Sequence, residues 1–153
     1  MNGNCVAPGA GLYRRIGGES ALRHFVARLY HHMDTLPEVG AIRDMHTLPL
    51  DAAAERLFRF LSGWLGGPPL YHQAYGEPRL RRRHLHVPIG ERERDQWLLC
   101  AQRALDDMHW ADAERSELMR LLRAMADHLV NRGGLGSQLR SNRKPRLSSL
   151  ARR

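Results

Sequence analysis

The sequence predicts an all-α protein, because several stretches of the chain repeat apolar residues at spacings of three and four. Such a spacing gathers apolar side chains on one side of a helix, where they can be buried together. No stretch alternates apolar and polar residues in the manner of a half-buried strand, and no segment repeats another. With 153 residues, the chain is long enough to form one domain around its own hydrophobic core.

The first long helix is expected to start at Gly17–Gly18 and to end before Pro37, which cannot continue it. The segment 36–50 is irregular, so we expect only short helical turns there. A second long helix is expected from Asp51 until residues 66–69, whose Gly-Gly-Pro-Pro sequence stops helices. Its apolar face is wide enough to predict burial on two sides: Ala54, Leu57, Phe58, Phe60, Leu61, Trp64 and Leu65.

Two further helices are expected later in the chain, the first capped by Gly90 and the second by Asp112. The last of them should end near Asn131, just before two glycines. Residues 70–89 are expected to form a long connection without a regular helix. Connections of that length inside a compact domain are usually functional or disordered, and the scattered apolar residues favour a functional one.

The two ends of the chain are expected to lie outside the folded domain, which we assign to residues 12–132. Residues 1–11 predict a flexible leader, and residues 133–153 predict a basic, disordered tail. This tail carries much of the formal net charge of +8. A basic tail can contact nucleic acid or an anionic membrane surface, or it can simply be solvated.

The cysteine content indicates a reducing compartment, since Cys5 and Cys100 form neither a disulfide framework nor a CxxC metal site. No charged head followed by an apolar run marks a signal peptide, and glycines and prolines interrupt the longest uncharged apolar stretch, residues 60–71. We therefore expect a cytoplasmic protein without a membrane span.

Residues 78–89 place His84 between a cluster of arginines and an apolar segment containing Pro88. An imidazole that faces an apolar space, with cations at its edge, suits an anionic, metal-bearing ligand such as haem. A solvated basic surface is the other interpretation of these residues.

Several motifs occur in order over residues 12–132: Ile16–Glu19, Leu29–Tyr30, Phe60–Tyr71, Gly76 with Pro78, Leu80–Leu85, Glu91–Arg92 and Asp95–Leu98. As a set they resemble the group II truncated haemoglobins. The resemblance implies a two-over-two sandwich of helices around one haem b, with His84 as the ligand of its iron. His86 is the rival ligand, but on a helical turn the two imidazoles would point about 200° apart. The family more often has proline and phenylalanine at positions 86 and 87, so His86–Val87 departs from its pattern.

On the side of the haem where a diatomic ligand binds, the resemblance implies a polar pocket formed by Tyr30, His46 and Trp97. The phenol and the indole would donate hydrogen bonds to that ligand. Core packing is the alternative role of both aromatic residues. Where many globins have a distal histidine, this chain has Ala53, which cannot donate and which would open a path into the pocket.

The haem walls implied by the same resemblance are apolar, and Arg83 stands out as the residue expected to hold a propionate, with Tyr71 and Arg81 as further candidates. Ordinary core packing explains any one wall residue equally well, and arginines are often simply solvated. The predicted wall residues are Ala53, Leu57, Phe60, Leu80 and Val87.

The expected function is the binding of dioxygen and other diatomic ligands, with redox or detoxification chemistry on NO or peroxide rather than oxygen delivery. Several hydrogen-bond donors around the ligand would slow its release. NO dioxygenation or a peroxidase-like activity would need an external electron donor, such as a reductase, because the chain shows no reductase domain. The alternative is a small basic helical module that binds nucleic acid without haem, with a steep dependence on salt.

Overall fold

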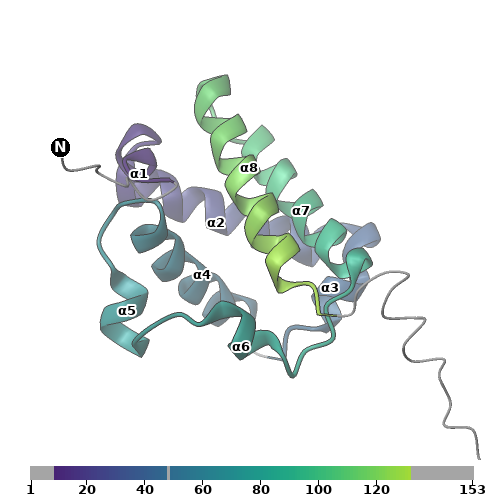
Figure 1. Ribbon diagram of the computed structural model, residues 1–153. Helices are drawn as coiled ribbons and strands as arrows, with labels where there is room; N and C mark the ends of the chain where they lie inside the picture. Colours follow the sequence, from purple (N-terminus) through teal and green to yellow (C-terminus); the bar gives the residue numbers. More distant parts are fainter. Residues whose placement is uncertain (1–8, 48, 132–153) are drawn as a thin grey trace, which may run out of the picture.

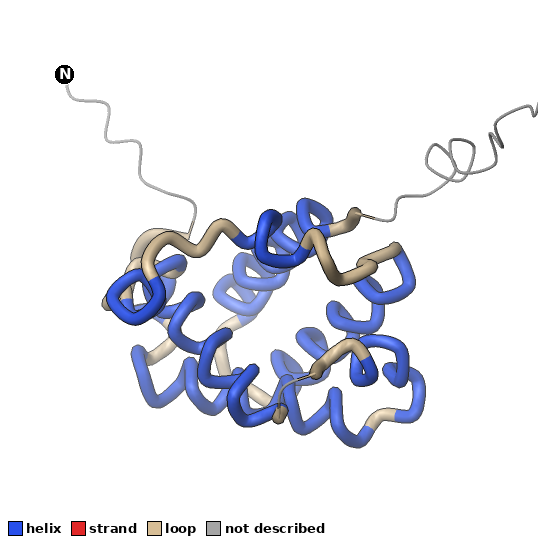
Figure 2. Tube along the Cα trace, turned by 90° about the horizontal axis from the view of Figure 1, so that it is seen from below, coloured by secondary structure: helices blue, strands red, loops and turns tan. Residues whose placement is uncertain are grey.

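The computed structural model describes residues 9–47 and 49–131 (Figure 1). Every regular element in this part of the chain is a helix, joined to the next by turns and loops (Figure 2). The long helices are α2 (Gly18–Thr35), α4 (Leu50–Trp64), α7 (Glu91–Asp106) and α8 (Asp112–Leu129). The short ones are α1 (Leu12–Arg15), the 3₁₀ turn η1 (Pro37–Val39), α3 (Gly40–Asp44), α5 (Leu70–Tyr75) and α6 (Leu80–His84).

The long helices form two packed pairs, α2 with α4 and α7 with α8. The contact between α2 and α7 joins the two pairs. Their facing sides make one core, in which the largest fully buried side chains include Phe25, Phe58, Leu61, Leu105 and Leu122. The all-α class and the long helices predicted from apolar spacing are thereby confirmed. No helix of the described chain is long and apolar enough to cross a lipid bilayer.

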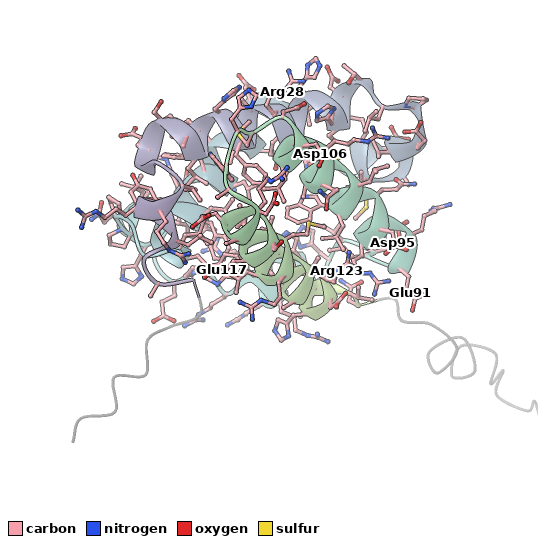
Figure 3. The ribbon with its side chains drawn as sticks, turned by 90° about the horizontal axis from the view of Figure 1, so that it is seen from above. Arg28, Glu91, Asp95, Asp106, Glu117 and Arg123 are labelled. Carbon is pink, nitrogen blue, oxygen red and sulfur yellow. The ribbon has the colours of Figure 1, made fainter. Side chains whose placement is uncertain are left out.

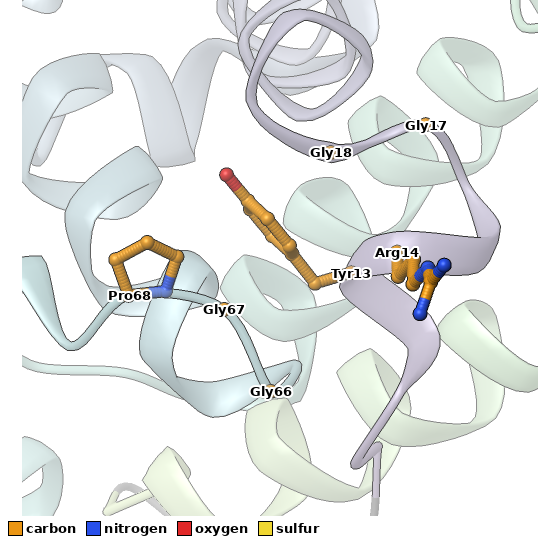
Figure 4. A pocket seen from close by; sticks show the side chains of 7 residues that line it. All are labelled: Tyr13, Arg14, Gly17, Gly18, Gly66, Gly67 and Pro68. Atoms are coloured by element: carbon orange, nitrogen blue, oxygen red, sulfur yellow. The ribbon is translucent and has the colours of Figure 1, made fainter.

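Two glycine turns bring the start of α2 and the end of α4 close to Tyr13 (Figure 4). Gly17 and Gly18 have φ values of 113° and 74°, which residues with a side chain rarely adopt. A Cβ atom on Gly67 would lie 2.6 Å from the Tyr13 ring. The buried Ser62 hydroxyl donates to the Pro68 carbonyl at 2.7 Å and fixes the turn that ends α4.

Three sequence-based expectations need correction. Residues 70–89 are not one irregular connection, because they contain α5 and α6. Asp112 is the first residue of α8 rather than its cap, a place taken by Ala111. Residues 9–11 of the expected leader form a turn in which Gly9 is buried. The predicted roles of residues 1–8 and of the tail fall outside the described residues.

Gly90 is confirmed as the N-terminal cap of α7, and the contact comes from its backbone. The Gly90 N–H donates to the Glu93 carboxylate at 3.0 Å, which satisfies a backbone donor at the start of the helix. Helix α7 therefore begins at a fixed point of the chain, six residues before Trp97.

Asp107, directly after the end of α7, joins this helix to α2 by an ion pair with Arg28 and a hydrogen bond with His32. One of its carboxylate oxygens accepts from Arg28 Nε at 2.8 Å and lies 2.7 Å from His32 Nε2. Figure 3 shows Arg28, in the middle of α2, close to Asp106, the last residue of α7 and the neighbour of Asp107. The hydrogen bond from Arg28 is the largest cause that lowers the pKa of Asp107 below its ordinary value of 3.8.

Asp107→Asn should therefore lose about 1 kcal/mol of stability near neutral pH, the size expected for a partly exposed ion pair. A depressed carboxylate pKa stabilises the fold above the pKa of the unfolded chain, and this contribution disappears as pH falls through the folded pKa. Urea unfolding from about pH 7 to about pH 3 should show the difference from wild type shrinking towards acid. Asp106→Asn, at an exposed residue bonded to Gln102, is the matched control. An equal loss at every pH would contradict the ionic explanation.

Candidate functional site

A cavity of about 350 Å³ lies among α2, α4, α6, α7 and α8, within the range of small-molecule sites. With the exception of Arg81, every residue predicted to contact a haem or its ligand lines it. They are Tyr30, His46, Ala53, Leu57, Phe60, Tyr71, Leu80, Arg83, His84, Val87 and Trp97. The fold brings these residues together from distant parts of the sequence. Their roles towards a haem stay predictions.

The cavity also has lining residues that were not predicted. Met125, Ala126 and Leu129 come from α8, for which no role at the site was predicted. Glu93 and Arg94 lie four and three residues before Trp97, on the same side of α7. That helical spacing was the signal that could have found them. Ile42, Met45, Thr47, Arg56, His86 and Ile89 complete the lining.

His84 is the last residue of α6, and its ring is half-buried at the cavity. Its Nδ1 lies 2.6 Å from the Leu80 carbonyl oxygen. A carbonyl only accepts, so Nδ1 carries a proton, and in the neutral imidazole Nε2 keeps a free lone pair. This is the tautomer and second hydrogen bond expected of an imidazole that ligates a metal.

The rival histidine, His86, is exposed in the turn after α6 and lies at the edge of the same cavity. Within the described residues no three His, Cys, Asp or Glu side chains gather into a metal site. A metal ion held by side chains alone does not fit this arrangement. A metal carried in an organic ring, which needs only one axial imidazole, does fit.

Tyr30 and His46 form the polar part of the wall near α3. Their rings meet edge to face, with centroids 5.8 Å apart. Burial raises the pKa of the Tyr30 phenol, so it stays protonated and able to donate. Within the described chain the Tyr30 hydroxyl makes no hydrogen bond to another residue. It is therefore available to a molecule in the cavity.

His46 has the same arrangement as His84. Its Nδ1 donates to the Ile42 carbonyl at 2.8 Å, which leaves Nε2 free. Burial is the main cause that lowers the pKa of His46 below 6.5, and the charge of Arg43 adds to it. The imidazole is therefore neutral at pH 7. Helix α3, which carries the Ile42 carbonyl, is held to α7 by the Gln96 side chain, which accepts from the Ile42 N–H at 3.0 Å.

The part of the wall that comes from α4 and α5 is aromatic. Phe60 stacks on Trp64, and Tyr71 meets Phe60 edge to face with centroids 6.3 Å apart. The Arg83 guanidinium lies 5.7 Å from the centre of the Tyr71 ring and makes a long hydrogen bond of 3.4 Å to the Tyr75 carbonyl. Arg83 is thus a cation at the cavity without a carboxylate partner in the described chain, as an anionic group at the cavity mouth would require.

Arg81, the other arginine considered for a propionate, does not line the cavity. Its guanidinium donates to the His128 carbonyl at the end of α8, at 2.8 Å. A second hollow of about 600 Å³ lies at the surface between the two glycine turns (Figure 4). Its polar side chains are Tyr13 and Arg14, and none of the predicted site residues borders it.

The bacterial-like globin family matches residues 11–131, which is nearly the whole described chain. The chain is a bacterial-like globin. This membership implies haem and ligand binding. The cavity of this globin fits a haem, because the His84 imidazole could hold the iron, the walls are largely apolar and Arg83 is a cation at the cavity.

Within this family the globin is similar to group II truncated haemoglobins. It is 34% identical over 114 residues to group 2 truncated haemoglobin YjbI of Bacillus subtilis, covering 74% of this chain and 84% of that one. The group II 2-on-2 haemoglobin of Agrobacterium tumefaciens is 39% identical, with a TM-score of 0.75 over 86% of this chain and 98% of its own. The cold-adapted truncated haemoglobin of Pseudoalteromonas haloplanktis is 38% identical, with a TM-score of 0.76 over 78% and 97%. The predicted two-over-two globin fold is thereby confirmed.

Proposed function

We propose that this globin holds haem b through His84 and binds dioxygen or another diatomic molecule beside Tyr30, His46 and Trp97. The observation that carries the proposal is the free Nε2 of His84 at an apolar cavity, with Nδ1 fixed on the Leu80 carbonyl. Haem supplies an iron that binds diatomic molecules and exchanges electrons. The protein's own side chains donate hydrogen bonds, accept protons and pair with the haem carboxylates.

Each polar side chain of the cavity has a distinct role in this proposal. Tyr30 donates its free hydroxyl hydrogen to the diatomic molecule, and the half-buried Trp97 offers its indole N–H. His46 is neutral and has a free Nε2, so it can act as a general base that accepts a proton from bound hydrogen peroxide as it reacts. Arg83 stands where it can pair with a propionate.

A role in redox or detoxification chemistry fits this pocket better than oxygen delivery. Donors that stabilise a bound, partly charged molecule also slow its departure. A proton acceptor next to these donors suits conversion of NO or peroxide. Turnover would need electrons from a separate donor, such as a reductase.

The nucleic-acid alternative has less support. Many arginines of the described chain are paired with carboxylates, including Arg15 with Glu117, Arg23 with Glu55 and Arg28 with Asp107. Paired arginines offer less free charge to a phosphate backbone. The apolar cavity has no purpose in such a module.

The test is a titration of the purified protein with haemin, followed by visible absorption spectroscopy. We expect saturation at one haem per chain, a sharp Soret band, and distinct ferric, ferrous and oxygenated spectra. A folded protein that binds no haem saturably would refute the proposal. Steeply salt-dependent binding to DNA by the same protein would then support the nucleic-acid module.

A further inference from the structure

Asn131 follows directly after the C-terminal cap of α8 and bonds to the segment that follows His84. Its side-chain Nδ2 donates to the carbonyls of His84, at 3.0 Å, and of Val87, at 2.8 Å. Its Oδ1 accepts from the Ile89 N–H at 2.9 Å. Its backbone N–H donates to the Ile89 carbonyl, also at 2.9 Å. One residue therefore makes four hydrogen bonds to residues 84–89.

These bonds satisfy backbone groups that the local structure leaves open. Helix α6 ends at His84, so the carbonyl of that residue has no partner from a following helical turn. It accepts one hydrogen bond from the Val87 N–H, at 3.0 Å, and the second from Asn131. Among the described residues no backbone N–H donates to the Val87 carbonyl, which accepts from the Asn131 amide instead. The Asn131 amide supplies the missing partners.

A second contact joins α6 to the C-terminal end of α8. Arg81 of α6 donates to the His128 carbonyl in the last turn of α8. Figure 1 shows α6 beside the C-terminal end of α8. That end also contributes Met125, Ala126 and Leu129 to the cavity wall. The position of α6 relative to the cavity therefore depends on where α8 ends.

We propose that Asn131 is a positioning residue that fixes the His84 backbone, and through it the direction of the His84 imidazole into the cavity. This inference rests on the proposed role of His84 as the iron ligand. The Leu80 carbonyl sets the rotation of the ring within α6, while Asn131 sets where α6 itself stands. Without the amide, the end of α6 is free to shift, and the strength and angle of the Fe–imidazole bond change with it.

The test compares wild type with Asn131→Ala and Asn131→Asp after loading with haem. Asn131→Asp keeps an oxygen for the Ile89 N–H but presents a carboxylate oxygen to the His84 and Val87 carbonyls. Two readouts are used: the Fe–His stretching band of the ferrous protein by resonance Raman, and the rate of haem transfer to an excess of an acceptor apoglobin. In both variants we expect a shifted, broadened band and about tenfold faster haem transfer.

Asp107→Asn is the matched control, because it weakens the fold at the other end of α7, away from the cavity lining. It should lower the melting temperature without shifting the Fe–His band. An unshifted band and unchanged transfer rate in both Asn131 variants would overturn the inference, whatever their melting temperatures. Failure of the wild type to bind haem would instead refute the proposed function on which the inference rests.

Discussion

His84→Gly is expected to abolish the Fe–His stretching band and the ferrous spectrum of a histidine-ligated haem, and imidazole added to the solution is expected to restore both. The substitution removes the cavity imidazole of α6, whose Nδ1 is fixed on the Leu80 carbonyl. The space that it leaves can admit a free imidazole as a replacement ligand. Resonance Raman and visible spectra, recorded with and without imidazole, measure the effect.

His86→Ala is the control for this experiment, since His86 is an imidazole two residues away at the edge of the same cavity. It should retain the spectrum of the wild type. The opposite result, with His86→Ala losing the band and His84→Gly keeping it, would assign the iron to His86. It would also mean that the turn after α6 rearranges when haem binds.

Tyr30→Phe is expected to speed the dissociation of dioxygen by about tenfold to a hundredfold. A hydrogen bond to a charged or partly charged acceptor contributes about 1.5 to 3 kcal/mol, and each 1.4 kcal/mol corresponds to a factor of ten. Because the Tyr30 hydroxyl has no hydrogen-bond partner in the described chain, its removal should cost the fold little. Stopped-flow mixing of the oxygenated protein with a scavenger measures the rate.

Tyr71→Phe provides the comparison, because Tyr71 lines the cavity but its ring packs between Phe60 and Tyr75. It should leave the dissociation rate within about twofold of wild type. Equal rates for wild type and Tyr30→Phe would remove Tyr30 from the ligand site. The argument for retention over delivery would then lose its main support.

The sequence predicted the long helices well because each has enough turns for its apolar stripe to stand out. Helices α5 and α6 have six and five residues, too few for a periodic pattern, and they were predicted as one irregular connection. Short helices of this size form through tertiary contacts, such as the Ser62 hydrogen bond to Pro68 just before α5. The spacing of apolar residues along the sequence does not reveal such contacts.

The candidate site was predictable where its residues belong to the family motifs, as with Tyr30, His84 and Trp97. The lining residues from α8 could not be predicted, because the spacing of apolar residues does not show whether they face a core or a cavity. The role of Asn131 could not be predicted either, since its hydrogen-bond partners His84 and Val87 lie 47 and 44 residues earlier in the sequence. An asparagine after a helix is ordinarily only an end signal.

The wall that α8 gives to the cavity has a consequence for how the protein is made. Synthesis runs from the N-terminus, so Tyr30 and His46 leave the ribosome long before Met125, Leu129 and Asn131. A nascent chain that already contains His84 still lacks one side of the cavity and the amide that anchors α6. If haem binds at this cavity, we expect it to be loaded only after α8 has been translated, rather than to guide the folding of the first helices.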